Sequence, residues 1–227
     1  MQPGDDVFTR ARRAWLKRAL LGGAAMPLLL RDALAARKPV SGMLRVSGDV
    51  QINGIAAGKG AVVKPGDSVI TAAGASAVFV VGKDAFLLRE NSELLTAGGR
   101  LLIASMRLVT GKLLSVFGRG QRRISTATAT IGIRGTGIYI ETQGERTYVC
   151  TCYGVVDMQA VNMPEARETV STTHHDAPRY IYAHGEMPIK MIEPAPVINH
   201  TDAELIMLEA LVGRKPPFVA SGMKHKY

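Results

Sequence analysis

The stretch SVITAAGASAVFVVGKDAFLL, residues 68–88, decides the fold class of this 227-residue chain. It contains three β-prone runs of four or five residues, 68–71, 77–81 and 85–88, and each intervening segment contains glycine. Runs this short, rich in Val, Ile and Phe and bounded by glycine-containing turns, are typical of β-strands and too short for helices. The stretch therefore predicts three consecutive strands.

The same pattern continues on both sides of this stretch. Val50–Ile52 is followed by Asn53-Gly54, which is a strong hairpin signal, and residues 64–67 (KPGD) have the composition of a turn. Turns recur about every 8–12 residues between residues 43 and 160, and no helical period runs through this region. We therefore expect an all-β core of short strands, arranged as a β-sandwich or a β-solenoid.

Composition excludes several classes of protein. An apolar fraction of 47% with 21% charged residues excludes a disordered chain, and two cysteines cannot form the disulfide framework of a small secreted domain. The net charge of +9 suggests nucleic acid or an anionic membrane as a partner. This suggestion depends on where the charges lie.

Part of the charge belongs to an N-terminal export signal. Residues 1–35 combine basic residues, an uncharged apolar run at 19–30 and the small-residue sequence Ala33-Leu34-Ala35. Arg12-Arg13 and the residues after it resemble the twin-arginine motif of signals that export folded proteins. We expect cleavage after Ala35 and a periplasmic protein. The alternatives are an uncleaved signal that anchors the chain in the inner membrane, and an amphipathic N-terminal helix.

The remaining charge does not indicate nucleic acid. Six of the 28 basic and three of the 19 acidic residues lie in residues 1–35, which leaves +6 on the other 192 residues. These charges are dispersed, and the basic residues around 119–123 and 214–226 are not interleaved with aromatic side chains that could stack on bases. We therefore expect no nucleic-acid partner, and membrane contact only through an uncleaved signal.

Several segments of the chain resemble one family. Residues 66–71 (GDSVIT), 83–84, 91–92 and above all 124–137 (ISTATATIGIRGTG) are similar to the FecR-like domain of iron-citrate-type signalling regulators. The resemblance covers about residues 44–142. It implies a periplasmic β-rich domain that works in sensing or protein contacts without catalysis. We expect no anti-sigma role, because only 18 residues precede the apolar run.

This resemblance divides the chain into three parts. The predicted boundaries are a signal peptide at 1–35, a FecR-like β domain at 36–160 and a C-terminal extension at 161–227. Within the domain, Arg134-Gly135-Thr136 is expected to form a tight structural turn, because the glycine spacing does not fit a nucleotide-binding loop and no helix pattern follows. Arg134 either binds an anionic ligand or holds neighbouring backbone carbonyls.

Two cysteines lie two residues apart in a segment of strand composition, residues 148–154. Alternation places Tyr148, Cys150 and Cys152 on one face of this strand, with Val149, Thr151 and Tyr153 on the other. The Cα atoms of such a pair lie about 6.5–7 Å apart, at or beyond the reach of a relaxed disulfide. The two thiols therefore suit metal binding or a redox role. The alternative is a pair of small buried apolar side chains.

His174-His175 lies downstream in a polar, turn-like segment. Together with Cys150 and Cys152, these imidazoles would form a four-coordinate soft site for zinc, copper or iron. His184 and His200 are candidate additional ligands. The alternative for the histidine pair is an exposed polar loop. The chain shows no arrangement of a nucleophile with a base, so we expect no enzymatic activity.

The C-terminal extension has its own pattern. Prolines at 188, 194 and 196 indicate an extended arm, and Thr201-Asp202-Ala203-Glu204 is a capping box at the start of an amphipathic helix of 10–12 residues that ends at Gly213. So short a helix is marginal alone in water and must dock. We expect it to dock on its own β-core or on a partner protein.

These observations support two main functions. The first is a non-enzymatic periplasmic FecR-like module that binds or senses in envelope signalling or assembly, with a protein partner in the cell envelope. The alternative is a metal-binding or redox protein that uses the Cys-x-Cys pair and the His-His loop. A third function, binding of envelope polysaccharide, has little aromatic surface to support it, because the one Trp lies in the predicted signal. The sequence specifies neither the ligand nor the oligomeric state.

Overall fold

The computed structural model describes residues 41–99, 102–175, 177–184 and 190–220, so the predicted signal at 1–35 lies outside the described residues. The strands are β1 (Gly42–Ser47), β2 (Val50–Ile52), β3 (Ile55–Ala56), β4 (Ser68–Thr71), β5 (Ser76–Val81), β6 (Asp84–Leu88), β7 (Ser92–Gly99), β8 (Leu102–Thr110), β9 (Lys112–Val116), β10 (Gln121–Ser125), β11 (Ala129–Gln143), β12 (Arg146–Ala160), β13 (Arg167–Thr172), β14 (Arg179–Tyr182) and β15 (Ile192–Pro194). Two helices follow, α3 (Asp202–Leu211) and α4 (Pro217–Ala220).

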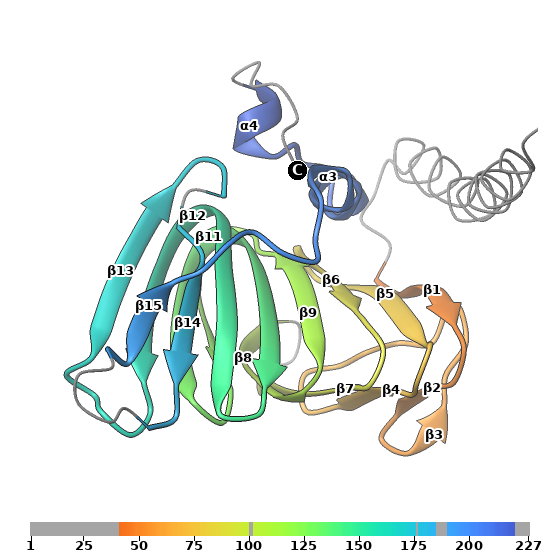
Figure 1. Ribbon diagram of the computed structural model, residues 1–227. Coiled ribbons are helices and arrows are strands. Elements are labelled where there is room, and N and C mark those ends of the chain that lie inside the picture. The colour runs from red at the N-terminus through yellow and green to blue at the C-terminus, as the bar shows by residue number, and fades with distance from the viewer. Residues whose placement is uncertain (1–40, 100–101, 176, 185–189, 221–227) are drawn as a thin grey trace, which may run out of the picture.

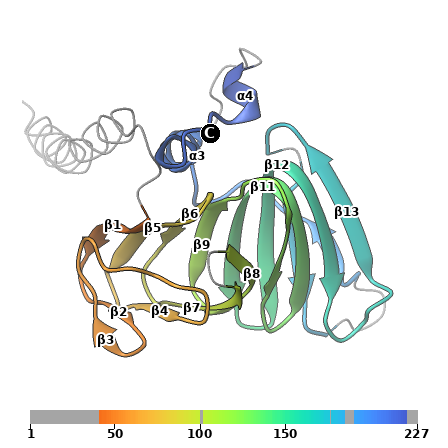
Figure 2. The same ribbon diagram turned by 180° about the vertical axis from the view of Figure 1, so that it is seen from behind.

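The strands form one sheet that curls into a half-barrel (Figures 1 and 2), which confirms the all-β prediction. One side of the sheet runs in the order β1-β5-β6-β9-β11, and the other continues as β10-β8-β7-β4-β2-β3. Apolar side chains from both sides meet inside the curl, among them Val69 and Leu94 opposite Phe79 and Phe86. We call the concave face of the sheet the inner face and the opposite one the outer face.

Local sequence signals account for several of these elements. β2 and β3 are joined by Asn53-Gly54, and both residues have positive φ, as a two-residue hairpin turn requires. The turn predicted at residues 64–67 precedes β4, with the Asp67 amide donating to the Lys64 carbonyl at 3.1 Å. The three strands predicted within 68–88 are β4, β5 and β6.

The longest hairpin, β11–β12, is interrupted by a bulge in which two backbones come close together. Gly135 and Gly154 both have positive φ, and a Cβ on Gly154 would lie 2.8 Å from the Gly135 carbonyl oxygen. The Arg134-Gly135-Thr136 segment therefore lies inside strand β11, rather than in a turn between two strands. Arg134 contacts a carboxylate, that of Asp157 at 3.0 Å, and not the neighbouring carbonyls that were one predicted alternative.

The bulge also changes which residues face outward. Tyr148, Cys150 and Cys152 share the outer face and Val149 the inner one, as alternation predicts. Tyr153 was expected opposite the cysteines, but its side chain packs with theirs, because the irregular backbone next to Gly154 breaks the alternation.

The sheet continues past residue 160, the boundary predicted between the β domain and the extension. β13 pairs with the second half of β12, and β14 pairs with its first half. Part of the predicted arm forms the short strand β15, which pairs with β14. Residues 161–194 therefore belong largely to the same sheet.

Helix α3 has the predicted capping box. The Thr201 hydroxyl accepts from the Glu204 amide, and the Glu204 carboxylate accepts from the Thr201 amide. The helix packs over β6 and β9 and buries Leu205, Leu208 and Leu211 against the outer face, so it docks on its own β-core. Among the described residues, no helix is both long enough and apolar enough to cross a bilayer.

Candidate metal centre

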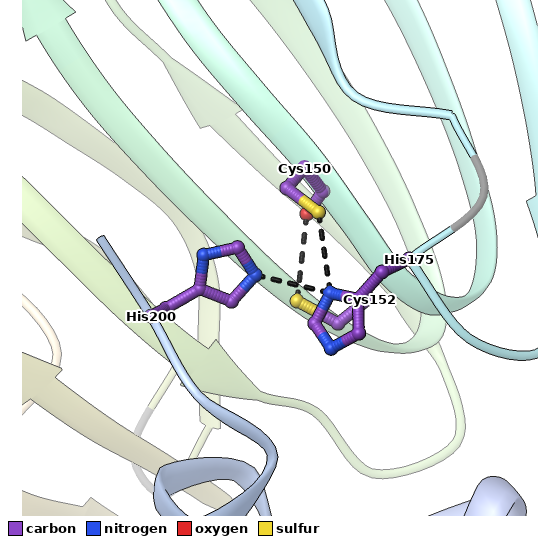
Figure 3. Close-up of side chains that lie close together, drawn as sticks. All are labelled: Cys150, Cys152, His175 and His200. Carbon is purple, nitrogen blue, oxygen red and sulfur yellow. Dashed lines mark hydrogen bonds between the residues drawn. The ribbon is translucent and has the colours of Figure 1, made fainter. Parts of the chain in front are cut away.

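Four side chains with metal-binding atoms converge where the C-terminal extension meets the outer face (Figure 3). Cys150 and Cys152 lie on β12, His175 in the loop between β13 and β14, and His200 immediately before the N-cap of α3. One ligand atom from each residue lies within 4.8 Å of each of the others. We call these four residues the Cys–His cluster.

The pairing of β12 explains how His175 reaches the cysteines. β13 pairs with β12 only from Gly154 onward and β14 only up to Val149, so among the described strands neither pairs with residues 150–153. The loop that joins β13 to β14 fills this gap, where the His175 amide donates to the Cys152 carbonyl at 3.0 Å. His175 has a φ of 47°, a left-handed conformation that costs free energy for a residue other than glycine.

The extended arm positions His200. The Tyr148 hydroxyl donates to the Pro196 carbonyl at 2.9 Å, which holds the arm against the sheet. The His200 imidazole stacks on the Tyr139 ring, with the ring centres 4.6 Å apart. Nδ1 of His200 lies 2.6 Å from the Ile198 carbonyl oxygen, which can only accept, so Nδ1 carries the proton. Nε2 is therefore left with a lone pair that points toward the cluster.

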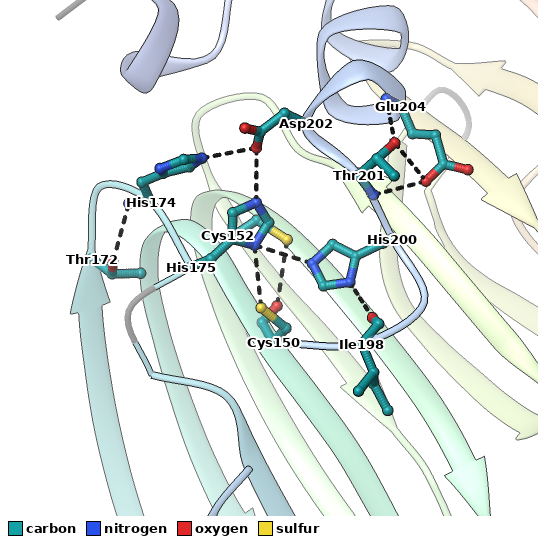
Figure 4. A network of polar contacts seen from close by, with 10 residues as sticks. All are labelled: Cys150, Cys152, Thr172, His174, His175, Ile198, His200, Thr201, Asp202 and Glu204. Carbon is teal, nitrogen blue, oxygen red and sulfur yellow. Dashed lines mark hydrogen bonds and ion pairs between the residues drawn. The ribbon is translucent and has the colours of Figure 1, made fainter. Parts of the chain in front are cut away.

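A carboxylate orients His175, as the Ile198 carbonyl orients His200 (Figure 4). Its Nε2 donates to Asp202 at 3.1 Å, and Nε2 of His174 lies 2.8 Å from the same carboxylate oxygen. A carboxylate or carbonyl that accepts the outer N–H of an imidazole is the usual second shell of a metal-bound histidine. Nδ1 of His175 is thereby left as the atom that faces the cysteines and His200.

The inward-facing atoms lie close to the separations found around a tetrahedral ion. With metal–sulfur bonds near 2.3 Å and metal–nitrogen bonds near 2.0 Å, tetrahedral ligand atoms lie about 3.3–3.8 Å apart. Nδ1 of His175 lies 3.4 Å from Sγ of Cys150 and 3.1 Å from Nε2 of His200. Two imidazole lone pairs this close repel unless a proton or a metal ion lies between them. The donor set therefore fits a cation.

The two thiols are electrostatically different. The hydrogen bond from Cys152 holds the pKa of Cys150 well below its ordinary value; burial opposes this, and the adjacent imidazoles of His175 and His200 add to the lowering. Burial raises the pKa of Cys152, and the neighbouring Cys150 raises it further. Burial also acts to lower the pKa of His175, but the contacts with Cys150 and Asp202 raise it above its ordinary value. The cluster therefore favours one thiolate, Cys150, beside a hydrogen-bonding thiol.

The structure distributes the predicted ligands over two adjoining groups. Cys150, Cys152 and His175 are brought together, and the fourth position is taken by His200, which was expected only as an additional ligand. His174 belongs with His175 and Asp202 to a second group, where it also packs on Phe218 of α4. His184 is exposed and belongs to neither group.

Sequence reasoning missed Asp202. The carboxylate occupies the first helical position of the capping box, where an acidic residue is explained by the helix alone. Asp202 therefore gave no separate signal, whereas His200, the fourth residue of the cluster, was signalled by its position immediately before a helix that must dock on the sheet.

The Cys–His cluster is closed to solvent. Cys150 and Cys152 are 0% exposed, His175 2% and His200 5%, under the arm and the first turn of α3. Both cysteines are free thiols. Four buried Cys and His ligands are typical of structural zinc sites, whereas catalytic sites keep one position open.

Comparison with known proteins gives little further information. No family model matches the chain, and no curated protein matches it. Among solved structures, the chain is similar to two crystal structures of a candidate anti-sigma factor from Parabacteroides distasonis ATCC 8503, at 1.65 and 2.50 Å resolution. Identity is 12% in both, with TM-scores of 0.45 and 0.44, and each match covers 56% of this chain and 58% of that chain.

Proposed function

We propose that this protein is an exported, non-enzymatic binding module whose C-terminal extension is fixed to the sheet by a thiophilic metal ion. The observation that carries the proposal is the donor set: two thiol sulfurs and two imidazole nitrogens, buried together, with the outer N–H of each imidazole already donated to an oxygen. The metal would connect β12, the β13–β14 loop and the arm that leads into α3.

Zinc is the expected metal. Two sulfurs and two nitrogens in a tetrahedral arrangement suit Zn²⁺, and the closed site leaves no coordination position for a substrate. Copper(I) also prefers thiolate ligands, and iron is the third candidate. A twin-arginine signal would allow the ion to bind in the cytoplasm, where the thiols stay reduced, before export to the periplasm.

Burial supports a structural rather than a catalytic role. Cys150, His175 and Asp202 are connected in the order of a nucleophile, a base and an orienting acid, which is a pattern found in hydrolytic enzymes. Here the sulfur is fully buried, so a substrate could reach it only if the C-terminal extension moved away. This supports a module that binds or senses, in agreement with the resemblance of residues 44–142 to FecR-like domains.

Metal analysis of the mature chain, purified folded from cytoplasm under reducing conditions, tests this proposal. We expect about one zinc ion per chain, and loss of that zinc in Cys150→Ser and in His200→Gln. His184→Gln is the matched control, because it removes an exposed histidine outside the cluster. Wild-type protein that stays metal-free after dialysis against zinc would overturn the proposal, as would zinc retained in full by both cluster variants.

A further inference from the structure

The arm and α3 leave open the part of the outer face formed by β8, β10, β11, β12 and β13. Ser105, Arg123, Gly132, Asp157 and Thr169 lie side by side across these strands, one residue from each. Two adjoining depressions of about 390 and 500 Å³ lie over this row and share three of the five residues, Arg123, Gly132 and Asp157.

This surface carries uncompensated positive charge. Five arginines line these two depressions and a third that adjoins them: Arg107, Arg122, Arg123, Arg134 and Arg167. Two are neutralised, because Arg122 pairs with the buried Asp84 and Arg134 pairs with Asp157.

The remaining three arginines have no acidic partner in the part of the chain that the structure describes. Arg107, Arg123 and Arg167 are exposed, and no described carboxylate forms an ion pair with them. The other acidic residue of the lining, Glu168, is paired with Arg179. We call the surface around these three arginines and Gly132 the arginine groove.

Gly132 forms the floor of the arginine groove, although the backbone conformation there does not require glycine. The φ of Gly132 does not lie in the positive range, and a Cβ there would approach nothing closer than 3.6 Å, from Asp157. Glycine in the interior of a strand costs stability and often marks a place where a ligand approaches the backbone. Gly132 thus keeps a polar depression open that most side chains would fill.

We propose that the arginine groove binds an acidic polysaccharide, a sugar chain that bears carboxylates. Guanidinium groups bind carboxylates in a two-point geometry, and the hydroxyls of Ser105 and Thr130 provide partners for sugar hydroxyls. The Thr169 hydroxyl donates to Asp157 and the Gln159 amide to the Pro164 carbonyl, so the oxygens of these two side chains can only accept from the sugar. Arg123 on β10 and Arg167 on β13 are three strands apart, about 14 Å at the usual strand spacing. That distance suits a chain of several sugar units.

The same features disfavour a protein partner at this surface. The lining contains no aromatic side chain, whereas the anchors of protein interfaces are most often tryptophan and tyrosine together with arginine. β10, β11 and β12 are paired on both sides over the groove, so a peptide could add to the sheet only beside it, at the outer edge of β13. Binding through charge also needs no aromatic side chain for stacking, in agreement with a lining that contains none.

The test is a binding titration of the mature chain with polygalacturonate, and with neutral dextran of similar length as the uncharged probe. We expect binding of polygalacturonate that weakens as salt is added, and none of dextran. Arg123→Gln and Arg167→Gln should each weaken binding about tenfold or more, as the loss of a charge-assisted contact predicts. Arg45→Gln on β1, which removes the same charge from an exposed position outside the groove, should change affinity less than about twofold.

A steric variant separates a built groove from general charge attraction. Gly132→Val keeps every charge, suits a strand and fills the floor, so it should abolish most of the binding. Gly58→Val, at an exposed loop glycine with open space around it and no positive φ, is its control and should bind normally. Thermal unfolding of each variant confirms that it is folded.

Several results would overturn the proposal. These are no binding by the wild-type chain, an equal loss in Arg45→Gln, or full binding by Gly132→Val. Tighter binding of polyglutamate would assign the groove to acidic peptides, and tighter binding of duplex DNA would assign it to nucleic acid. Either result would replace the polysaccharide as the ligand.

Discussion

Strands β11 and β12 present two different surfaces on the same outer face, one on each side of the bulge at Gly135 and Gly154. On one side lie Tyr139, Tyr148 and the two cysteines, covered by the arm and α3. On the other side lie Arg134, Gly132 and Asp157, open to solvent. Two neighbouring stretches of one hairpin therefore carry a closed candidate site for a cation and an open candidate site for an anion.

Burial of one surface and exposure of the other give them different roles. The covered half holds its polar atoms out of water, so unpaired lone pairs are costly there and a bound ion gives a large stabilisation. In the open half water screens the charges, so the arginines add little stability and are available for ligands. The covered half is therefore expected to determine stability, and the open half binding.

Removing the metal should cause the largest loss of stability, and this loss should come from the covered half. A chelator added to the zinc-loaded mature chain should lower the free energy of unfolding by at least about 4 kcal/mol, the linkage expected when the ion is present at a thousand times its dissociation constant. Urea unfolding with and without chelator measures this loss. Limited proteolysis should show faster cleavage between residues 195 and 215, because the arm and α3 lose their attachment. Unchanged unfolding and cleavage would contradict a structural metal.

Gly154→Ala tests the bulge that separates the two halves. Its φ of 93° and the 2.8 Å approach of the Gly135 carbonyl to the added Cβ predict a loss of about 2 kcal/mol or more in unfolding free energy. Gly132→Ala, in the partner strand but with ordinary φ and free space, should cost nothing or stabilise slightly. Equal unfolding midpoints for the two variants would show that the bulge does not constrain the backbone.

Asp202→Asn tests whether the carboxylate beside the Cys–His cluster strengthens metal binding. The carboxylate orients His175 and His174, so its loss should weaken zinc binding about 10- to 100-fold, measured by competition with a chromophoric chelator. Glu204→Gln is the matched control, because it removes a carboxylate from the same helical turn whose contacts are Arg89 and Thr201. An equal effect of the two substitutions would assign the change to helix stability rather than to the metal's surroundings.

Arg134→Gln should have the smallest effect on stability. The Arg134–Asp157 pair is exposed, with side chains 60% and 42% accessible, so its loss should change the unfolding free energy by less than about 1 kcal/mol. Thermal unfolding at low and high salt measures it. A larger loss that persists in high salt would mean that the open half also contributes substantially to stability.

Sequence patterns predicted most of what depends on neighbouring residues. The Asn53-Gly54 hairpin, strand β4 and the capping box of α3 each follow from a few adjacent side chains with defined backbone preferences. The site was predicted in part: the cysteines and His175 were named, whereas the fourth position depends on where the arm docks. Asp202 gave no separate signal, because the helix start already explains it.

The features that sequence could not show depend on distant pairings. The turn proposed at Arg134-Gly135-Thr136 is a bulge because Gly154 lies opposite it, 19 residues along the chain from Gly135. Because of that bulge, the Tyr153 side chain lies on the same face as the cysteines, whereas alternation predicted the opposite face. The arginine groove needs the parallel pairing of β8 with β10 to bring Ser105 beside Arg123, and alternation within one strand cannot predict which strands become neighbours.

X-ray absorption at the metal edge of the zinc-loaded mature chain directly tests whether the Cys–His cluster binds the ion. Two sulfur ligands near 2.3 Å and two nitrogen ligands near 2.0 Å per zinc ion are predicted, about one ion per chain. In Cys150→Ser the sulfur signal should disappear together with the metal. A metal bound only by nitrogen and oxygen, or a sulfur signal unchanged in that variant, would contradict the account.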